Sequence, residues 1–215
     1  AYICGVNHLY AVGGSQAIGA MAYGTESVPK VDVIVGPGNK FVASAKKAVY
    51  GTVGIDMIAG PTEVMILADS SAKPEWVAAD LLAQAEHDVV AQAVLVTDDE
   101  KLASKVSEQI EVQLETLTTK ATARQSIDTY GKIILVDSLE QAVEIVNKKA
   151  PEHLELAMED GKQRDKIEKL VHNYGSMFIG HASAEVFGDY AAGINHTLPT
   201  SGSARFTGGL SVRMF

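Results

Sequence analysis

The segment VMILADSSAKPEWVAADLLAQAEHDVVAQAVLVTD, residues 64–98, decides the fold of this chain. Its apolar runs at 64–69 and 91–98 predict two strands, and the Ala- and Leu-rich stretch after Pro74 predicts a helix between them. A strand, a helix and a second strand in this order are typical of an α/β unit with parallel strands. We therefore expect the α/β class, with largely parallel sheets.

The same alternation continues on both sides of this segment. Further strands are predicted at 8–12, 31–36, 55–60, 132–138 and 176–180, and further helices at 15–24, 41–51, 100–118 and 139–150. The order predicts two Rossmann-like lobes, formed by residues 1–62 and 63–215. The chain begins without Met in a strand-like segment and stops just after a Gly-rich stretch. We therefore expect a fragment with incomplete sheets.

Composition excludes several classes of function. With 215 residues, 47% hydrophobic and 21% charged, the chain is an ordinary globular protein. A net charge of −9 argues against nucleic acid or an anionic membrane as partner. The single Cys4 excludes an intrachain disulfide and a thiolate metal cluster, which fits a reducing, cytoplasmic location. No apolar run has the roughly 18 residues of a transmembrane helix.

The run LLAQAEHD, residues 81–88, places Gln84 and His87 three positions apart in the predicted helix. Residues at this spacing share one helical face. Imidazole is a common zinc ligand, and side-chain oxygens complete mixed sites. Two ligands do not hold a metal ion, so other segments must contribute.

Two glycine turns lie between a predicted strand and a predicted helix, at residues 12–16 and 36–39, and they contain Gln16 and Asn39. Glycine lets the backbone approach a ligand closely, and a helix N-terminus favours a phosphate. Neither turn matches G-x-G-x-x-G, so nucleotide binding and plain tight turns both stay open.

The sequence PEHLE, residues 151–155, places Glu152 beside His153. A carboxylate and an imidazole can divide acid–base work between them. Spacing alone favours the simpler interpretation, an exposed pair in a loop.

Two further segments contain candidate site residues. GDYAAGINHTLPT, residues 188–200, contains Asp189 and His196, which could bind metal or substrate, or could cap a helix and bond to backbone. Thr62 lies near the expected seam between the lobes, where ligand clefts are common, although turn chemistry also explains its Gly-Pro neighbours.

Taken together, six motifs resemble histidinol dehydrogenase in order and spacing over essentially the whole chain. They are VGGSQAIGAMAYGT, VGPGNKFVASAK, IDMIAGPTEV, LLAQAEHD, PEHLE and GDYAAGINHTLPTSG. The resemblance implies oxidation of L-histidinol to L-histidine through histidinaldehyde, the last steps of histidine biosynthesis, with reduction of two NAD molecules. It also implies two Rossmann-like lobes, of which residues 1–62 are the NAD side, a zinc ion, and a homodimer with a shared active site.

The resemblance also implies roles for individual residues. His153 would take the proton of the alcohol, and Glu152 would activate the water that attacks the aldehyde. The remaining assignments are zinc and substrate for Gln84, His87 and Asp189, substrate for Thr62 and His196, substrate as well for Glu152 and His153, and NAD for Gln16 and Asn39.

The chain departs from the family pattern in two respects. Thr62 stands where the family usually has Ser, which keeps the hydroxyl and adds a methyl group. Family segments with a fourth zinc ligand His, a substrate-binding Glu and an NAD-contacting Tyr have no counterpart here, so the 215 residues alone are expected to be inactive or nearly so.

Two other functions compete with this interpretation. A metal-dependent hydrolase could use Gln84, His87 and Asp189 around a zinc-bound water, with Glu152 as base, but the motif H-E-x-x-H is missing. A non-catalytic domain with structural zinc would normally need more Cys or His ligands.

Overall fold

The computed structural model describes residues 1–190 and 192–215, so Ala191, inside the predicted motif 188–200, lies outside the described residues. Contacts within the chain divide it into two compact units, Ala1–Gly60 with Leu210–Phe215, and Pro61–Gly209. The functional lobes 1–62 and 63–215 stay a prediction, because this division reflects contacts alone.

The first unit contains two helices and a short parallel sheet. The elements are α1 (Gly14–Tyr23), β1 (Val33–Ile34), α2 (Lys40–Val49) and β2 (Gly54–Ile55). Buried Ile18, Ala22, Ile34, Val49 and Val53 form its small core. The predicted helices are confirmed, but the predicted strand at 8–12 is wrong, because those residues are exposed and pair with no strand in the described chain.

The second unit is built on a five-stranded parallel sheet with the order β5-β4-β3-β6-β7. Its strands are β3 (Glu63–Ala68), β4 (Gln92–Thr97), β5 (Lys132–Leu135), β6 (His153–Ala157) and β7 (Ser176–Ile179). The expected α/β class is therefore confirmed.

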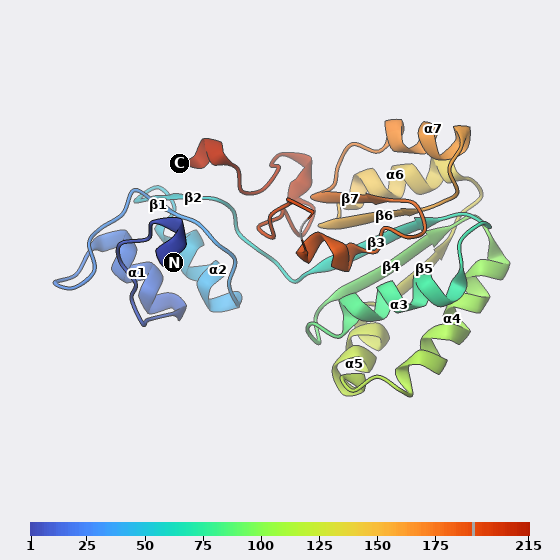
Figure 1. Cartoon of the computed structure of the whole chain (residues 1–215), viewed down its shortest axis with the longest axis horizontal. Coiled ribbons are helices and arrows are strands. Elements are labelled where there is room, and N and C mark those ends of the chain that lie inside the picture. Colours follow the sequence, from blue (N-terminus) through green and yellow to red (C-terminus); the bar gives the residue numbers. More distant parts are fainter. Residues whose placement is uncertain (191) are drawn as a thin grey trace. The chain divides into compact units, whose positions relative to one another are not determined.

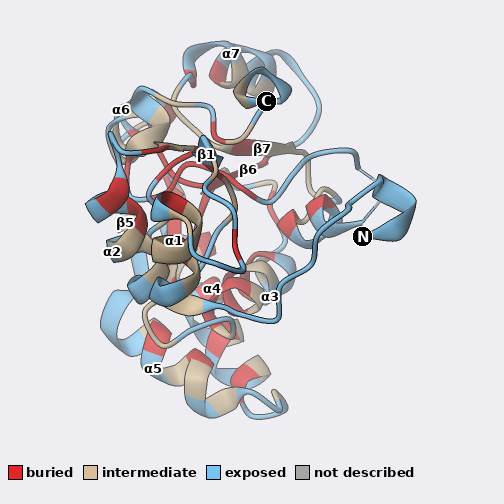
Figure 2. Ribbon diagram, turned by 90° about the vertical axis from the view of Figure 1, so that its left-hand side faces the viewer, coloured by how far each residue is buried: buried red, intermediate tan, exposed pale blue. Residues whose placement is uncertain are grey.

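Helices cover both faces of this sheet, as Figure 1 shows. Those helices are α3 (Pro74–Ala85), α4 (Glu100–Leu114), α5 (Lys120–Tyr130), α6 (Leu139–Lys149) and α7 (Lys162–Leu170). Helices α3, α4 and α5 pack against one face around Ile66 and Leu95, and α6 and α7 pack against the other around Leu67 and Leu156. The central strands β3, β4 and β6 are buried along almost their whole length and form the red centre of the unit in Figure 2.

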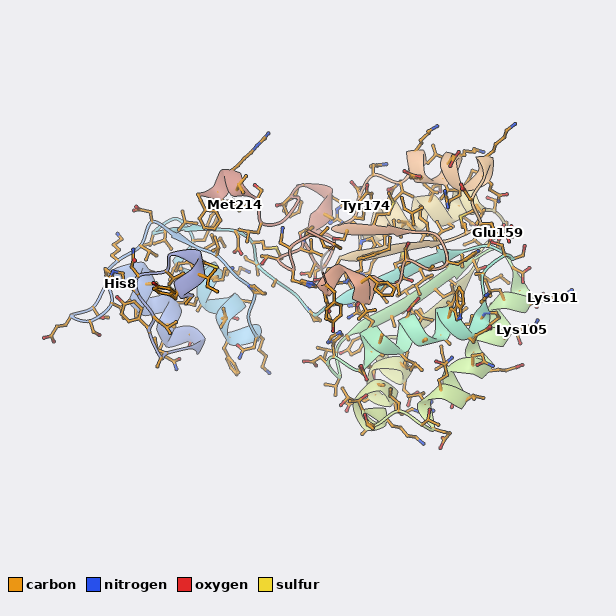
Figure 3. All side chains as sticks on the ribbon, viewed as in Figure 1. His8, Lys101, Lys105, Glu159, Tyr174 and Met214 are labelled. Atoms are coloured by element: carbon orange, nitrogen blue, oxygen red, sulfur yellow. The ribbon has the colours of Figure 1, made fainter. Side chains whose placement is uncertain are left out.

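Local signals explain where several helices begin. Pro74 occupies the first turn of α3, where its missing N–H costs nothing. The side chains of Asp99 and Ser138 accept hydrogen bonds from the first turns of α4 and α6. The exposed Lys101 and Lys105 of α4 point away from the sheet (Figure 3), as expected for the solvated face of a charged helix.

Three predictions about elements were wrong or incomplete. The helix predicted over 100–118 ends at Leu114, and the polar segment beyond it forms α5. Strand β6 and helix α7 were not predicted. His153 opens β6, so Glu152 and His153 are buried rather than an exposed loop pair.

The last turns of α3 and α6 lie at the edge of the sheet where the parallel strands begin. Each crossover helix runs opposite to its strands, so its last turn lies near the point where the next strand begins. The amino ends of β3 and β6, paired through Val64 and His153, therefore share this edge with the last turn of α3. No helix among residues 1–190 and 192–215 has the length and apolarity needed to span a lipid bilayer.

Candidate active site

A chain of hydrogen bonds joins Thr62, Gln84 and Glu152 at this edge. The Thr62 hydroxyl donates to Oε2 of Glu152 at 2.7 Å and accepts from Nε2 of Gln84 at 3.0 Å. The backbone N–H of Glu63 donates to the same Glu152 oxygen at 3.1 Å. Three segments far apart in sequence thus meet at one carboxyl group.

Burial sets the acidity of Glu152. It raises the pKa of Glu152 to about 7, although the hydrogen bonds from Thr62 and Glu63 favour the carboxylate. A carboxyl group with a pKa near neutrality can accept and release a proton under physiological conditions.

His153 follows directly, as the first residue of β6. Burial lowers the pKa of His153 to about 4, against the opposing effect of a hydrogen bond with the Glu63 backbone. The imidazole is therefore neutral at pH 7 and able to accept a proton.

Glu185 brings a second carboxyl group to His153. It opens the 3₁₀ segment Glu185–Asp189, and its Oε2 lies 3.1 Å from Nδ1 of His153, whereas Oε2 of Glu152 lies 3.9 Å from that nitrogen. Burial, helped by the negative charges of Asp189 and Glu152, raises the pKa of Glu185 to about 7.

The side chains of Asp189 and His196 contact each other. Nε2 of His196 lies 2.6 Å from Oδ1 of Asp189, and the two side chains are 52% and 40% exposed. The charges of His196, Asp189 and His87 all act on the pKa of His153, so these groups lie within electrostatic range of it. The six predicted residues Gln84, His87, Glu152, His153, Asp189 and His196 thus gather in one unit, with Thr62.

His87 differs from its predicted place on the helix. Helix α3 ends at Ala85, and His87 is exposed just beyond it, with its N–H 3.3 Å from the carbonyl oxygen of Gln84. The prediction that Gln84 and His87 share one helical face is therefore wrong for His87, because α3 ends two residues before it, although a turn still holds the two residues together.

Gln16 and Asn39 belong to the first unit. Gln16 is exposed in the first turn of α1, two residues after Gly14, whose φ of +72° favours glycine. Asn39 caps α2, and its side-chain oxygen accepts from the N–H groups of Phe41 and Val42 at 3.1 and 3.2 Å. Nothing in either unit tests their predicted contact with NAD.

Comparison with known proteins gives the family. A family model described as histidinol dehydrogenase matches residues 1–215. The chain belongs to the histidinol dehydrogenase family. Histidinol dehydrogenase from Streptococcus mutans is 54% identical over 215 residues, which are 100% of this chain and 50% of that protein. The Synechococcus enzyme is 54% identical over 211 residues, which cover 98% of this chain and 48% of that protein.

Solved structures agree with this family. A crystal structure of histidinol dehydrogenase from Elizabethkingia anophelis matches with a TM-score of 0.93 and 45% identity, over 100% of this chain and 49% of that one. A gamma-glutamyl phosphate reductase from Thermotoga maritima, at 14% identity and a TM-score of 0.52, shares the fold alone over 81% of this chain and 50% of that one. The chain spans about half the length of the histidinol dehydrogenases it matches.

Sequence reasoning missed the buried carboxyl groups around His153. Glu185 belongs to no motif of its own, and Glu155 lies on the strand that was not predicted. The alternation of Leu154 and Leu156 with more polar neighbours was the available signal for that strand, and it would have placed Glu155 on the same face as His153.

Proposed function

We propose that this chain carries the acid–base pair, three zinc ligands and most of the substrate contacts of an NAD-linked histidinol dehydrogenase. The reaction is the four-electron oxidation of L-histidinol to L-histidine through histidinaldehyde. The observation that carries this proposal is the meeting of Thr62, Glu152 and His153 with the last turn of α3 and the loop of Asp189. Family membership supports the same reaction.

His153 is the proposed base for both oxidations. Its buried, neutral imidazole accepts the hydroxyl proton of the alcohol while hydride leaves the adjacent carbon. NAD, when bound, accepts that hydride. The hydrated aldehyde has the same H–C–O–H unit as the alcohol, so the imidazole repeats this role in the second oxidation.

Glu152 is the proposed base for hydration of the aldehyde. Its carboxylate takes a proton from water as the water oxygen attacks the carbonyl carbon. A pKa of about 7 suits this step, because the carboxyl group can accept the proton and release it again at neutral pH. Thr62 fixes the carboxyl group through its hydroxyl, and Thr62 and His196 would contact the substrate.

The proposed zinc ligands are Gln84, His87 and Asp189. Oε1 of Gln84 is buried and has no hydrogen-bond partner among the described residues, as an oxygen kept for a ligand would be. One amide oxygen, one imidazole and one carboxylate are suitable zinc donors, so the residues fit the metal. Among the described residues, no group of three or more His, Cys, Asp or Glu is placed so that it could hold a metal ion by itself, and Gln84 is outside those types. Zinc would hold and orient histidinol rather than activate water.

The proposed NAD contacts are Gln16 and Asn39. Because Oδ1 of Asn39 is used by the cap of α2, its amide N–H₂ is the group left to face a ligand. We also propose, from the family resemblance, a cytoplasmic homodimer in which the partner subunit completes the site.

The test is NADH formation from L-histidinol by the full-length protein that contains these residues. Two NADH per histidine are expected, with loss of activity after chelation and recovery with zinc. His153→Asn should lower turnover sharply, whereas the matched variant His172→Asn, at an exposed histidine outside the site, should not. Hydrolytic activity without NADH formation would instead support the metal-dependent hydrolase.

A further inference from the structure

The proposed mechanism assigns no role to Glu185. Among the described residues, however, its carboxyl group is the acidic group nearest to the His153 ring nitrogen Nδ1. Oε2 of Glu185 and Nδ1 of His153 lie 3.1 Å apart, and the side chains are 8% and 10% exposed. Neither atom has a hydrogen-bond partner among the described residues, so the two atoms approach closely without the alignment of a hydrogen bond. Contacts of this kind often align only when substrate is bound.

Buried groups fix the position of Glu185. Its backbone N–H donates to Oε1 of Glu155 at 2.8 Å, and Glu155 is in turn hydrogen-bonded to Asp80 of α3. The ring of Phe178, on the neighbouring strand β7, lies 6.2 Å from the His153 ring. The backbone of Glu185 is therefore anchored to β6 through Glu155 and, through Asp80, to α3.

Glu152 is less suited to support the imidazole. Its nearer oxygen is 3.9 Å from Nδ1 and already accepts from the Thr62 hydroxyl and the Glu63 N–H. The two carboxyl groups therefore have different surroundings, one bound to donors at the start of β3 and one directed at the imidazole.

We propose that Glu185 is the positioning residue of His153, which orients its imidazole and balances the positive charge that forms when the imidazole takes a proton. This inference rests on the proposed function of His153. The substrate O–H bond breaks, an N–H bond forms on His153, and the electron pair of the C–H bond goes to NAD as hydride. Glu185 gains and loses no proton in this step, since its effect is electrostatic.

Isosteric replacement of Glu185 tests the idea in the full-length protein. Glu185→Gln keeps size and one acceptor but removes the charge, and we expect kcat to fall on the order of tenfold to a hundredfold. The KM for histidinol, the zinc content and the melting temperature should stay close to those of the parent. Glu159→Gln is the matched control, because Glu159 is exposed and lies well away from the site (Figure 3).

A double variant separates positioning from a general structural role. If Glu185 acts through His153, Glu185→Gln should cause no further loss in the His153→Asn background. Multiplied losses in the double variant, or a fully active Glu185→Gln, would overturn the inference while His153→Asn still showed the base to be needed. A fully active His153→Asn would instead refute the proposed function.

Discussion

Replacement of Thr62 by Val tests whether one hydroxyl keeps Glu152 usable as a base. The Thr62 hydroxyl donates to the Glu152 carboxyl group at 2.7 Å, and the Glu63 N–H remains as a second donor. A hydrogen bond to a charged group contributes about 1.5–3 kcal/mol. At about 1.4 kcal/mol per pH unit, its loss should raise the pKa of Glu152 by roughly one to two units.

The pKa of Glu152 is expected to rise because the base is a carboxylate, which the Thr62 hydroxyl stabilises. Burial already raises the pKa of Glu152 to about 7, and loss of a donor destabilises the carboxylate further. The ionised base then forms only at higher pH, so the acid limb of kcat/KM for histidinaldehyde should move upward by the same one to two units. NADH formation across a pH series measures this limb.

Thr62→Ser is the matched control, because it keeps the hydroxyl and loses only a methyl group. Its acid limb should stay near that of the parent. An acid limb in Thr62→Val that is unchanged, or that moves to lower pH, would refute this account of Glu152.

Three further predictions concern stability. Glu152→Gln should gain up to about 3 kcal/mol of unfolding free energy relative to the parent as pH rises from 4.5 to 7. The parent loses stability over this range because its unfolded chain ionises Glu152 readily, whereas the folded chain holds the proton up to a pKa of about 7. Urea unfolding at both pH values measures the difference, and a difference that does not change with pH would contradict the prediction. Asp56→Asn leaves the buried Lys46 without its negatively charged partner, with the Gly36 carbonyl oxygen still accepting from Nζ. About 3–5 kcal/mol should therefore be lost in the same assay, and unchanged stability would show that the pair is dispensable. Gly14→Ala, at φ +72°, should cost about 1–3 kcal/mol. Its control Gly13→Ala, with φ −141° and open space, should cost less, and equal losses would contradict the backbone argument.

Much of the fold could be predicted because its strongest signals are local. The apolar run that became β3 is buried along its whole length, and Pro74, Asp99 and Ser138 begin helices as short-range chemistry requires. The crossover order then predicts a parallel sheet without any knowledge of long-range contacts.

The errors arose where pairing or burial decides the structure. The segment 8–12 has strand composition but no partner strand among the described residues, and composition alone does not supply one. Conversely, β6 carries His153 and Glu155, whose polarity hides a strand that is buried along its whole length.

The candidate site was predicted largely through motifs and resemblance. Spacing alone favoured an exposed loop for Glu152 and His153, and only the sheet explains their burial and shifted pKa values. Glu185 reaches His153 through tertiary folding over more than 30 positions, which a single sequence does not reveal.

Zinc content tests most directly whether separate residues of the site bind the metal and transfer protons. Elemental analysis of the full-length protein should find zinc retained in His153→Asn, which removes a base, and strongly reduced in His87→Asn, which removes a ligand. Equal loss of zinc from both variants would contradict the separation of metal binding from proton transfer.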